Sequence, residues 1–466
     1  MKQSSSLMLV LSELGFNGWD KYNVDYSYKD GNPPKVVETY SAQVQQEAFI
    51  KNMYISGLFS KENIWESINI MGGFKDPVST FNSICTHLNG AGAFQPSFEK
   101  FKAAEILKNL FSESIFDNQD IQDFILYWTQ TAFNRKVNQE RTSLATMDWM
   151  QNNDLKKDYF ENAKIMGLVV AKVPLVESYD ETWVLGSAAL PLIWNMDNLK
   201  NIKELKGVNL GFERFLTGKR ELSNMGALES PGFIKKVADF IGVKYIGEPN
   251  SFIERSDGRQ YLNYAEGETK KVYESDLVKY IYQDCFNKPL DEQNLIDVVA
   301  REGTARPDTG DTIKAALNKL IQEVEEKEEF KKGKEITILI TSIQPHIERQ
   351  RIGAQRIIDN ELKNKDFAHI KISTHSLAPE LNEQVALTNI SILHSDMATL
   401  ISEQYLKITE GKEAKRDTGH LMFQSRQQYL KENLPPMPEP VLLGEMVREE
   451  FPLELALKEV GSHLSL

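Results

Sequence analysis

From about residue 161 onward, strand-like runs alternate with amphipathic helical stretches, and this alternation limits the folds open to the chain. The clearest strand is 336–340, which is β-branched and uncharged, as a buried parallel strand should be. The segment that follows it, 346–362, has the apolar spacing of a helix. Strands that alternate with helices form βαβ units. The sequence therefore predicts an α/β domain with a mostly parallel sheet over residues 156–410.

Other segments of this domain follow the same alternation. Further strands are expected at 183–185, 212–216, 295–299 and 369–373, and further helices at 231–241, 274–285 and 383–408. Residues 242–268 interrupt the pattern and are interpreted as an irregular insertion. Several polar segments of this domain fall where a predicted strand ends and a predicted helix begins.

The region before this domain has few β-branched runs and is predicted to form a mainly helical N-terminal lobe, residues 1–155. One apolar helix face is indicated by Ile121, Phe124, Ile125 and Trp128, which recur at spacings of three and four. A structural core explains this lobe better than a cofactor site does. The tail, 411–466, contains a proline-rich stretch at 435–438 and is expected to pack back on the body.

Composition narrows the class of protein. With 466 residues, 41% of them hydrophobic and 26% charged, the chain is predicted to be a globular protein of two or three domains. A net charge of −13 argues against a nucleic-acid partner. Two cysteines form neither a disulfide framework nor a metal cluster, so no metal site is predicted. No apolar run approaches the roughly 20 residues of a membrane span, so we expect a protein without a membrane partner that is cytoplasmic, or else secreted by a route that needs no classical signal.

Polar residues gather at four predicted strand ends: Gly186-Ser187, 217–220, 306–312 and 341–346. In a parallel sheet these ends project from one edge, where α/β proteins bind ligands. Glycine permits close approach of a ligand, and the first turn of a following helix attracts an anion. Positive charge would come from Lys219, Arg220, Arg306 and Arg349. The sequence therefore predicts a site for an anionic small molecule that carries a phosphate or carboxylate.

Each of these residues also has a structural interpretation. Asp308 and Asp311 have the spacing of a helix N-cap pair, and capping is the favoured interpretation when the pair is taken alone. Arg306 could pair with a local carboxylate, and Glu274 suits a helix start for its dipole alone. His346 has a pKa suited to acid–base chemistry, although a lone histidine is more often structural. No GxSxG, HExxH, P-loop or GxGxxG motif is present.

The order of five segments resembles the DUF218 superfamily of YdcF-, SanA- and ElyC-like proteins, closest to a soluble bacterial branch. The segments are 184–186, 216–222 (LTGKREL), 274–276, 306–312 (RPDTGDT) and 341–346 (TSIQPH), and the resemblance covers roughly residues 160–375. It implies a Rossmann-like, doubly wound sheet with a polar cleft at its carboxyl edge, and S-adenosylmethionine or another nucleotide-like compound as a possible ligand. That branch usually carries an arginine in the helix after the first strand, whereas no Arg or Lys lies between Pro191 and Asp197 here.

Two functional hypotheses follow. In the first, the cleft binds a nucleotide-like or phosphorylated molecule, with a transferase or hydrolase activity as one form of this hypothesis. Candidate acid–base residues are Glu274, Asp311 and His346, and candidate binding residues are Gly186, Ser187, Thr217, Gly218, Lys219, Arg220, Arg306, Thr309, Thr312, Ser342 and Gln344. In the second, the chain is a non-enzymatic, effector-like protein whose helical lobe binds a protein partner.

Overall fold

The computed structural model describes residues 23–25, 35–38, 40–71, 74, 76–94, 100–109, 147–204, 208–300, 307–325, 327, 333–364, 367, 369–388, 390–408 and 433–439. The chain divides into two compact units, one of Met1–Trp19, Tyr40–Met166 and Gln404–Leu466, the other of Asp20–Thr39 and Gly167–Glu403. The predicted apolar face at 121–128 and most of the tail lie outside the described residues. No described helix is long and apolar enough to cross a bilayer.

The described part of the first unit is helical. Its helices are α2 (Ala42–Ile55), α3 (Lys61–Met71), α4 (Pro77–Gly90), α5 (Ala103–Asn109) and α7 (Asn153–Ile165). Asp76 and Asn152 cap α4 and α7 by accepting hydrogen bonds from backbone N–H groups of the first turn. Between α2 and α7, the buried Asn52 donates to the carbonyl of Tyr159 at 3.1 Å and accepts from Asn162 at 2.9 Å. Buried amides thus fix the contact between these two helices.

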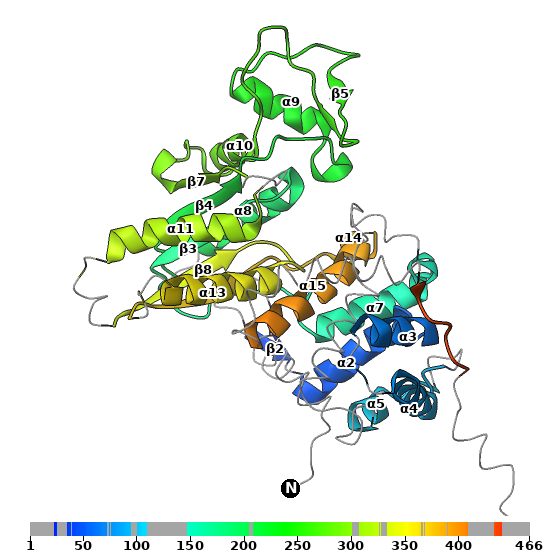
Figure 1. Cartoon of the computed structure of the whole chain (residues 1–466). Coiled ribbons are helices and arrows are strands. Elements are labelled where there is room, and N and C mark those ends of the chain that lie inside the picture. The colour runs from blue at the N-terminus through cyan, green and yellow to red at the C-terminus, as the bar shows by residue number, and fades with distance from the viewer. Residues whose placement is uncertain are drawn as a thin grey trace, which may run out of the picture. The chain divides into compact units, whose positions relative to one another are not determined.

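The second unit contains a five-stranded sheet in which every strand pairs with its neighbours in parallel. The strands are β3 (Glu181–Leu185), β4 (Phe212–Gly218), β7 (Leu295–Val298), β8 (Glu335–Thr341) and β9 (Lys371–Leu377), in the spatial order β7-β4-β3-β8-β9. The chain moves from β3 outward to β7, then returns beside β3 and moves outward to β9 (Figure 1). This order reverses direction between β3 and β8 and confirms the doubly wound, Rossmann-like α/β fold.

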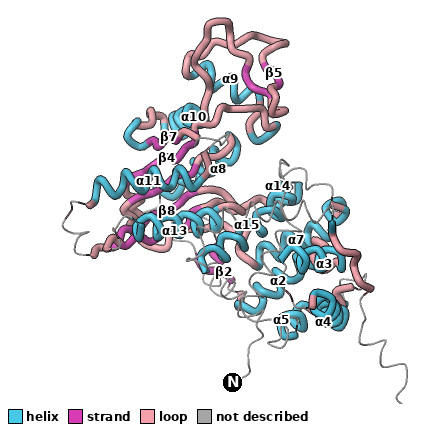
Figure 2. The backbone as a smooth tube through the Cα atoms, in the orientation of Figure 1, coloured by secondary structure: helices cyan, strands magenta, loops and turns pink. Residues whose placement is uncertain are grey.

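Helices cover both faces of the sheet (Figure 2). One face packs against α8 (Ala189–Glu204), α9 (Pro231–Phe240) and α10 (Glu274–Phe286), and the other against α11 (Thr309–Val324) and α13 (Ile347–Asn364). Successive strand residues point to opposite faces, so Val184 joins the first core while Trp183 and Leu185 join the second. Both faces are buried, which explains the near-continuous apolar runs of β3 and β8.

Three local expectations change. The expected helix at 383–408 is two helices, α14 (Glu383–Thr388) and α15 (Ile390–Ile408). The expected irregular insertion contains an antiparallel hairpin of β5 (Phe252–Glu254) and β6 (Gln260–Leu262). Elsewhere, β1 (Asn23–Asp25) pairs antiparallel with β2 (Lys35–Glu38). The strand expected at 369–373 runs instead over Lys371–Leu377, because its polar residues pair along the whole length of β8.

Candidate functional site

At the carboxyl ends of β3 and β4, the predicted anion-binding arginine is bound by carboxylates of the protein itself. Arg220 donates to both carboxylate oxygens of Glu229, at 3.0 and 2.9 Å, and to Glu274 at 3.2 Å. Glu229 is fully buried, and the Arg220 side chain is 12% exposed. Burial alone would lower the pKa of Arg220, but the two carboxylates outweigh it and raise that pKa further above its ordinary value. Arg220 and Glu274 therefore form a buried ion-pair cluster.

The two glycines predicted to admit a ligand at this edge admit other parts of the chain instead. A Cβ on Gly186 would clash with the Glu274 carboxylate and come within 2.8 Å of the Leu216 carbonyl oxygen. A Cβ on Gly218 would lie 2.5 Å from Cγ of Pro307. Close approach is needed at both positions, as glycine indicated, but the approaching groups belong to α10, β4 and the segment before α11.

The other predicted residues near β4 are also engaged locally. The buried Thr217 hydroxyl lies 3.2 Å from the carbonyl oxygen of Ile296 and 3.3 Å from the Asp297 carboxylate of the neighbouring strand. Lys219 is exposed, and its ammonium lies 5.6 Å from the centre of the Tyr273 ring. Ser187 follows β3 and is half-buried. These contacts hold β4 and β7 together.

The start of α11 is a capping box. Asp308 accepts from the backbone N–H of Asp311 at 2.9 Å, and Asp311 accepts from the backbone N–H of Asp308 at 3.0 Å. This confirms the capping interpretation of the pair. Thr309 is exposed, and the Thr312 hydroxyl donates to the Thr309 carbonyl at 2.9 Å. Arg306, the third predicted cation, lies outside the described residues.

After β8, the predicted residues separate. The backbone N–H of the buried Ser342 donates to the Leu377 carbonyl at 3.1 Å, which extends the pairing of β8 with β9. His346 directly precedes α13, and its Nδ1 lies 2.8 Å from a carboxylate oxygen of Asp396 on α15. Arg349 donates to that same oxygen at 2.8 Å. Asp396 is 2% exposed, so the His346 ring and the Arg349 guanidinium are both directed to a buried carboxylate.

A pocket does lie at the carboxyl edge of the sheet, beside β8 and β9. One wall is a stripe along α8, formed by Trp194, Asp197, Asn198 and Asn201. Their spacing of three, four and seven residues puts the four side chains on one face of the helix. We call this cavity the α8 pocket.

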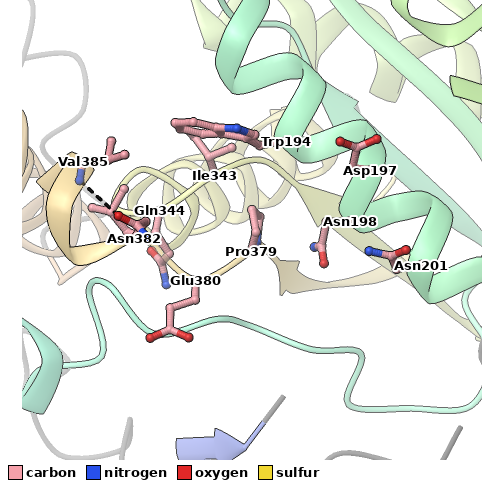
Figure 3. Close-up of a pocket in the computed structure, with 11 residues that line it drawn as sticks. Trp194, Asp197, Asn198, Asn201, Ile343, Gln344, Pro379, Glu380, Asn382 and Val385 are labelled. Carbon is pink, nitrogen blue, oxygen red and sulfur yellow. Dashed lines mark hydrogen bonds between the residues drawn. The ribbon is translucent and has the colours of Figure 1, made fainter. Parts of the chain in front are cut away.

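The rest of the α8 pocket comes from the turns that follow the two strands. Ile343 and Gln344 follow β8, and Pro379 to Asn382, with Val385 of α14, follow β9. The cavity has a volume of about 460 Å³, within the range typical of small-molecule sites. Figure 3 shows the α8 side chains at one side and Gln344, Asn382 and Val385 at the other. Among the predicted site residues that the structure describes, Gln344 alone lines it.

Two buried amide atoms in the wall of the α8 pocket have unused hydrogen-bonding capacity. Nε2 of Gln344 donates to the carbonyls of Gly167 and Val170, but its Oε1 finds no hydrogen-bond partner among the described residues. Nδ2 of Asn198 likewise has none among them. Gln344 is 1% exposed. Buried polar atoms are nearly always bonded in folded proteins, so two exceptions in one pocket wall indicate a missing partner.

The charge of the lining differs from the predicted one. Its ionisable side chains are the exposed carboxylates Asp197 and Glu380, and no described lining residue is basic. Neither carboxylate forms an ion pair with a described residue. Across the described residues, no group of three or more His, Cys, Asp or Glu side chains is placed to hold a metal ion. The lining therefore suits a ligand that carries hydroxyl or amino groups better than one that carries phosphate.

Most of the pocket was not foreseen from the sequence. The stripe of Trp194, Asp197, Asn198 and Asn201 shows helical spacing, but a polar stripe on a helix usually marks a solvated face. A tryptophan within that stripe was the signal that could have drawn attention to it. The segment 379–382 carries no motif, and only the pairing of β8 with β9 brings it beside Gln344.

Comparison of the chain with protein-family models, with curated proteins and with solved structures finds no match. The resemblance to the DUF218 superfamily therefore stays a prediction, and the case for a function depends on the α8 pocket.

Proposed function

We propose that this protein binds a small polar molecule in the α8 pocket. The observation that carries the proposal is the pair of buried amide atoms, Asn198 Nδ2 and Gln344 Oε1, that lack partners in the pocket wall. Leaving a buried donor or acceptor unbonded costs about 1–3 kcal/mol, which a ligand that bonds both atoms would recover. The apolar side chains of the lining, Trp194, Ile343 and Pro379, would favour such a ligand over water.

The place of the pocket in the fold supports the same proposal. Open α/β sheets bind ligands beyond the carboxyl ends of their strands, close to the point where strand order reverses. In this sheet the reversal lies between β3 and β8, and Ile343 and Gln344 follow β8 directly. The lining combines Trp194, Ile343 and Pro379 with amides and carboxylates, a mixture typical of small-molecule sites.

A fluorine label on tryptophan tests the proposal without assuming a ligand class. The chain has six tryptophans, so full-length protein grown with 5-fluorotryptophan would show a small set of ¹⁹F resonances, with Trp194 assigned from the Trp194→Phe variant. We expect at least one compound in a chemically mixed panel to shift the Trp194 resonance and leave that of the buried Trp183 unchanged. If no compound moves Trp194 selectively, the proposed pocket function is wrong.

The predicted phosphorylated or nucleotide-like ligand belongs in the same panel, together with S-adenosylmethionine. Its predicted contacts Lys219 and Arg220 do not line the α8 pocket, and Arg220 is bound by Glu229 and Glu274. The interaction-protein alternative, with the helical lobe as the binding surface, also stays a prediction.

A further inference from the structure

The chemistry of the two partnerless atoms restricts what the α8 pocket can bind. Asn198 Nδ2 is a donor and needs an acceptor, whereas Gln344 Oε1 is an acceptor and needs a donor. A phosphate is an anion and would be repelled by the carboxylates Asp197 and Glu380. An ammonium group offers donors only and would leave Asn198 without a partner. A hydroxyl group both donates and accepts, so a ring with several hydroxyls can offer a donor to Gln344 and an acceptor to Asn198.

From this complementarity we infer that the α8 pocket recognises an uncharged, polyhydroxylated ring, as found in a free sugar, a glycoside or the ribose of a nucleoside. This inference rests on the proposed pocket function and names its ligand class. Because both amide atoms are buried, a small rotation of the Gln344 and Asn198 side chains would bring them into reach of the ligand. Hydroxyls would then donate to Gln344 Oε1 and to the carboxylates, and accept from Asn198 Nδ2. The ligand would thereby bond two atoms that have no partner among the described residues.

The apolar part of the lining fits the same ligand. Trp194 offers the large flat surface of an indole, and Figure 3 shows it beside Ile343 above Pro379. A sugar ring has a face of C–H groups that can pack on an aromatic ring, while its hydroxyls remain free for the amides at the rim. The cavity volume of about 460 Å³ is enough for one such ring with a substituent.

The test uses the full-length fluorotryptophan protein and four named probe types: methyl glycosides of the common hexoses, adenosine, inorganic phosphate and spermidine. We expect a glycoside or adenosine, at millimolar concentration, to shift the Trp194 resonance. A response to glycosides identifies a sugar ligand, and a response to adenosine alone identifies a nucleoside whose ribose is bound.

Variants then test the hydrogen bonds. Asn198→Ala should weaken binding of the responding probe about tenfold, the order expected when one buried hydrogen bond is lost. Asn198→Asp keeps the size of the side chain but replaces the donor by an acceptor, and should weaken binding at least as much. Glu204→Gln is the matched control, because Glu204 is exposed on the same helix and does not line the pocket.

The outcomes separate the ligand class from the pocket itself. If phosphate or spermidine shifts Trp194 and the glycosides and adenosine do not, the ligand class is overturned while the pocket function stands. The same holds if a glycoside binds folded Asn198→Ala and Asn198→Asp as tightly as it binds the wild type. If nothing in the broad panel shifts Trp194, both the pocket function and the ligand class fall.

Discussion

The carboxyl edge of the sheet has two halves that use polar side chains in opposite ways. At the ends of β3 and β4, Arg220 is bound by Glu229 and Glu274, and Gly186 packs directly against Glu274. Beside β8 and β9, the α8 pocket leaves Asn198 Nδ2 and Gln344 Oε1 without partners among the described residues. In the first half the charged side chains pair with one another. In the second half, two buried amide atoms have no hydrogen-bond partner among the described residues.

This difference shows that residue type at a strand end does not by itself reveal a ligand site. The β3–β4 half carries the glycines and the arginine that usually signal anion binding, yet its anions are protein carboxylates. The β8–β9 half carries weaker sequence signals for a ligand, yet it holds the buried amide atoms that have no partner among the described residues. Substitution of Arg220 in the first half and of Asn198 in the second should therefore have opposite effects on stability.

The largest effect on stability is expected in the β3–β4 half. Arg220→Ala would leave Glu229 buried without its partner, and breaking a buried ion pair costs about 3–5 kcal/mol. Chemical denaturation followed by circular dichroism measures the loss. Lys219→Ala is the matched control, since Lys219 is the exposed neighbour and should change stability by less than about 0.5 kcal/mol. Equal effects of the two variants would contradict the assignment of Arg220 to a buried cluster.

The next effect concerns the face of the β8–β9 half that α13 covers, where a buried carboxylate is fully bonded. Glu348 lies in the first turn of α13 and accepts from Arg351 and, at 3.0 Å, from Ser376. Burial raises its pKa, but the charges of Arg351 and Lys172 and these hydrogen bonds outweigh burial and hold the pKa at about 2. Because the folded pKa lies below the ordinary value, the stabilisation is present above about pH 4.5 and is lost as the pH falls toward 2.

Glu348→Gln should therefore cost about 3 kcal/mol at neutral pH, and the difference from the wild type should shrink between about pH 4.5 and 2. Denaturation curves at several pH values measure it. Glu254→Gln, a change of an exposed carboxylate on β5, should show a small difference that does not vary in this way. A constant deficit for Glu348→Gln across the range would show that its ionisation does not stabilise the fold.

A moderate effect is expected from Gly186→Ala. The added methyl group would press on Glu274 and on the Leu216 carbonyl, and overpacking of this kind costs about 1–3 kcal/mol. Gly232→Ala in α9 is the control, because a Cβ there meets nothing within 4 Å. Melting temperatures of the two variants give the comparison. If Gly186→Ala is as stable as Gly232→Ala, then space remains between β3 and α10, and a ligand could enter there.

The smallest effect has the opposite sign. Asn198→Leu removes a buried donor that lacks a partner, so the stability of the ligand-free protein should stay unchanged or rise by up to about 1 kcal/mol. Melting temperature without ligand is the measurement. A loss of more than about 1 kcal/mol would mean that Asn198 supports the fold, and the contrast between the two halves would weaken.

The sequence by itself determined most strands and helices of the α/β domain and their order. The β-branched run of β8, the apolar stripes of the helices and the Asp308–Asp311 capping pair all depend on residues a few positions apart, so local spacing reveals them. Parallel pairing followed from the alternation of strands with helices, which also placed residues 186, 217–220 and 342–344 at one edge.

Only the tertiary structure decided which side chains meet at that edge. Arg220 pairs with Glu274, 54 residues later, and the α8 pocket joins α8 to turns that follow β8 and β9. Such contacts depend on how helices pack on the sheet, and no local periodicity encodes them. The sequence therefore identified the edge and the need for close approach at Gly186, whereas packing decided that a carboxylate fills one half and a pocket occupies the other.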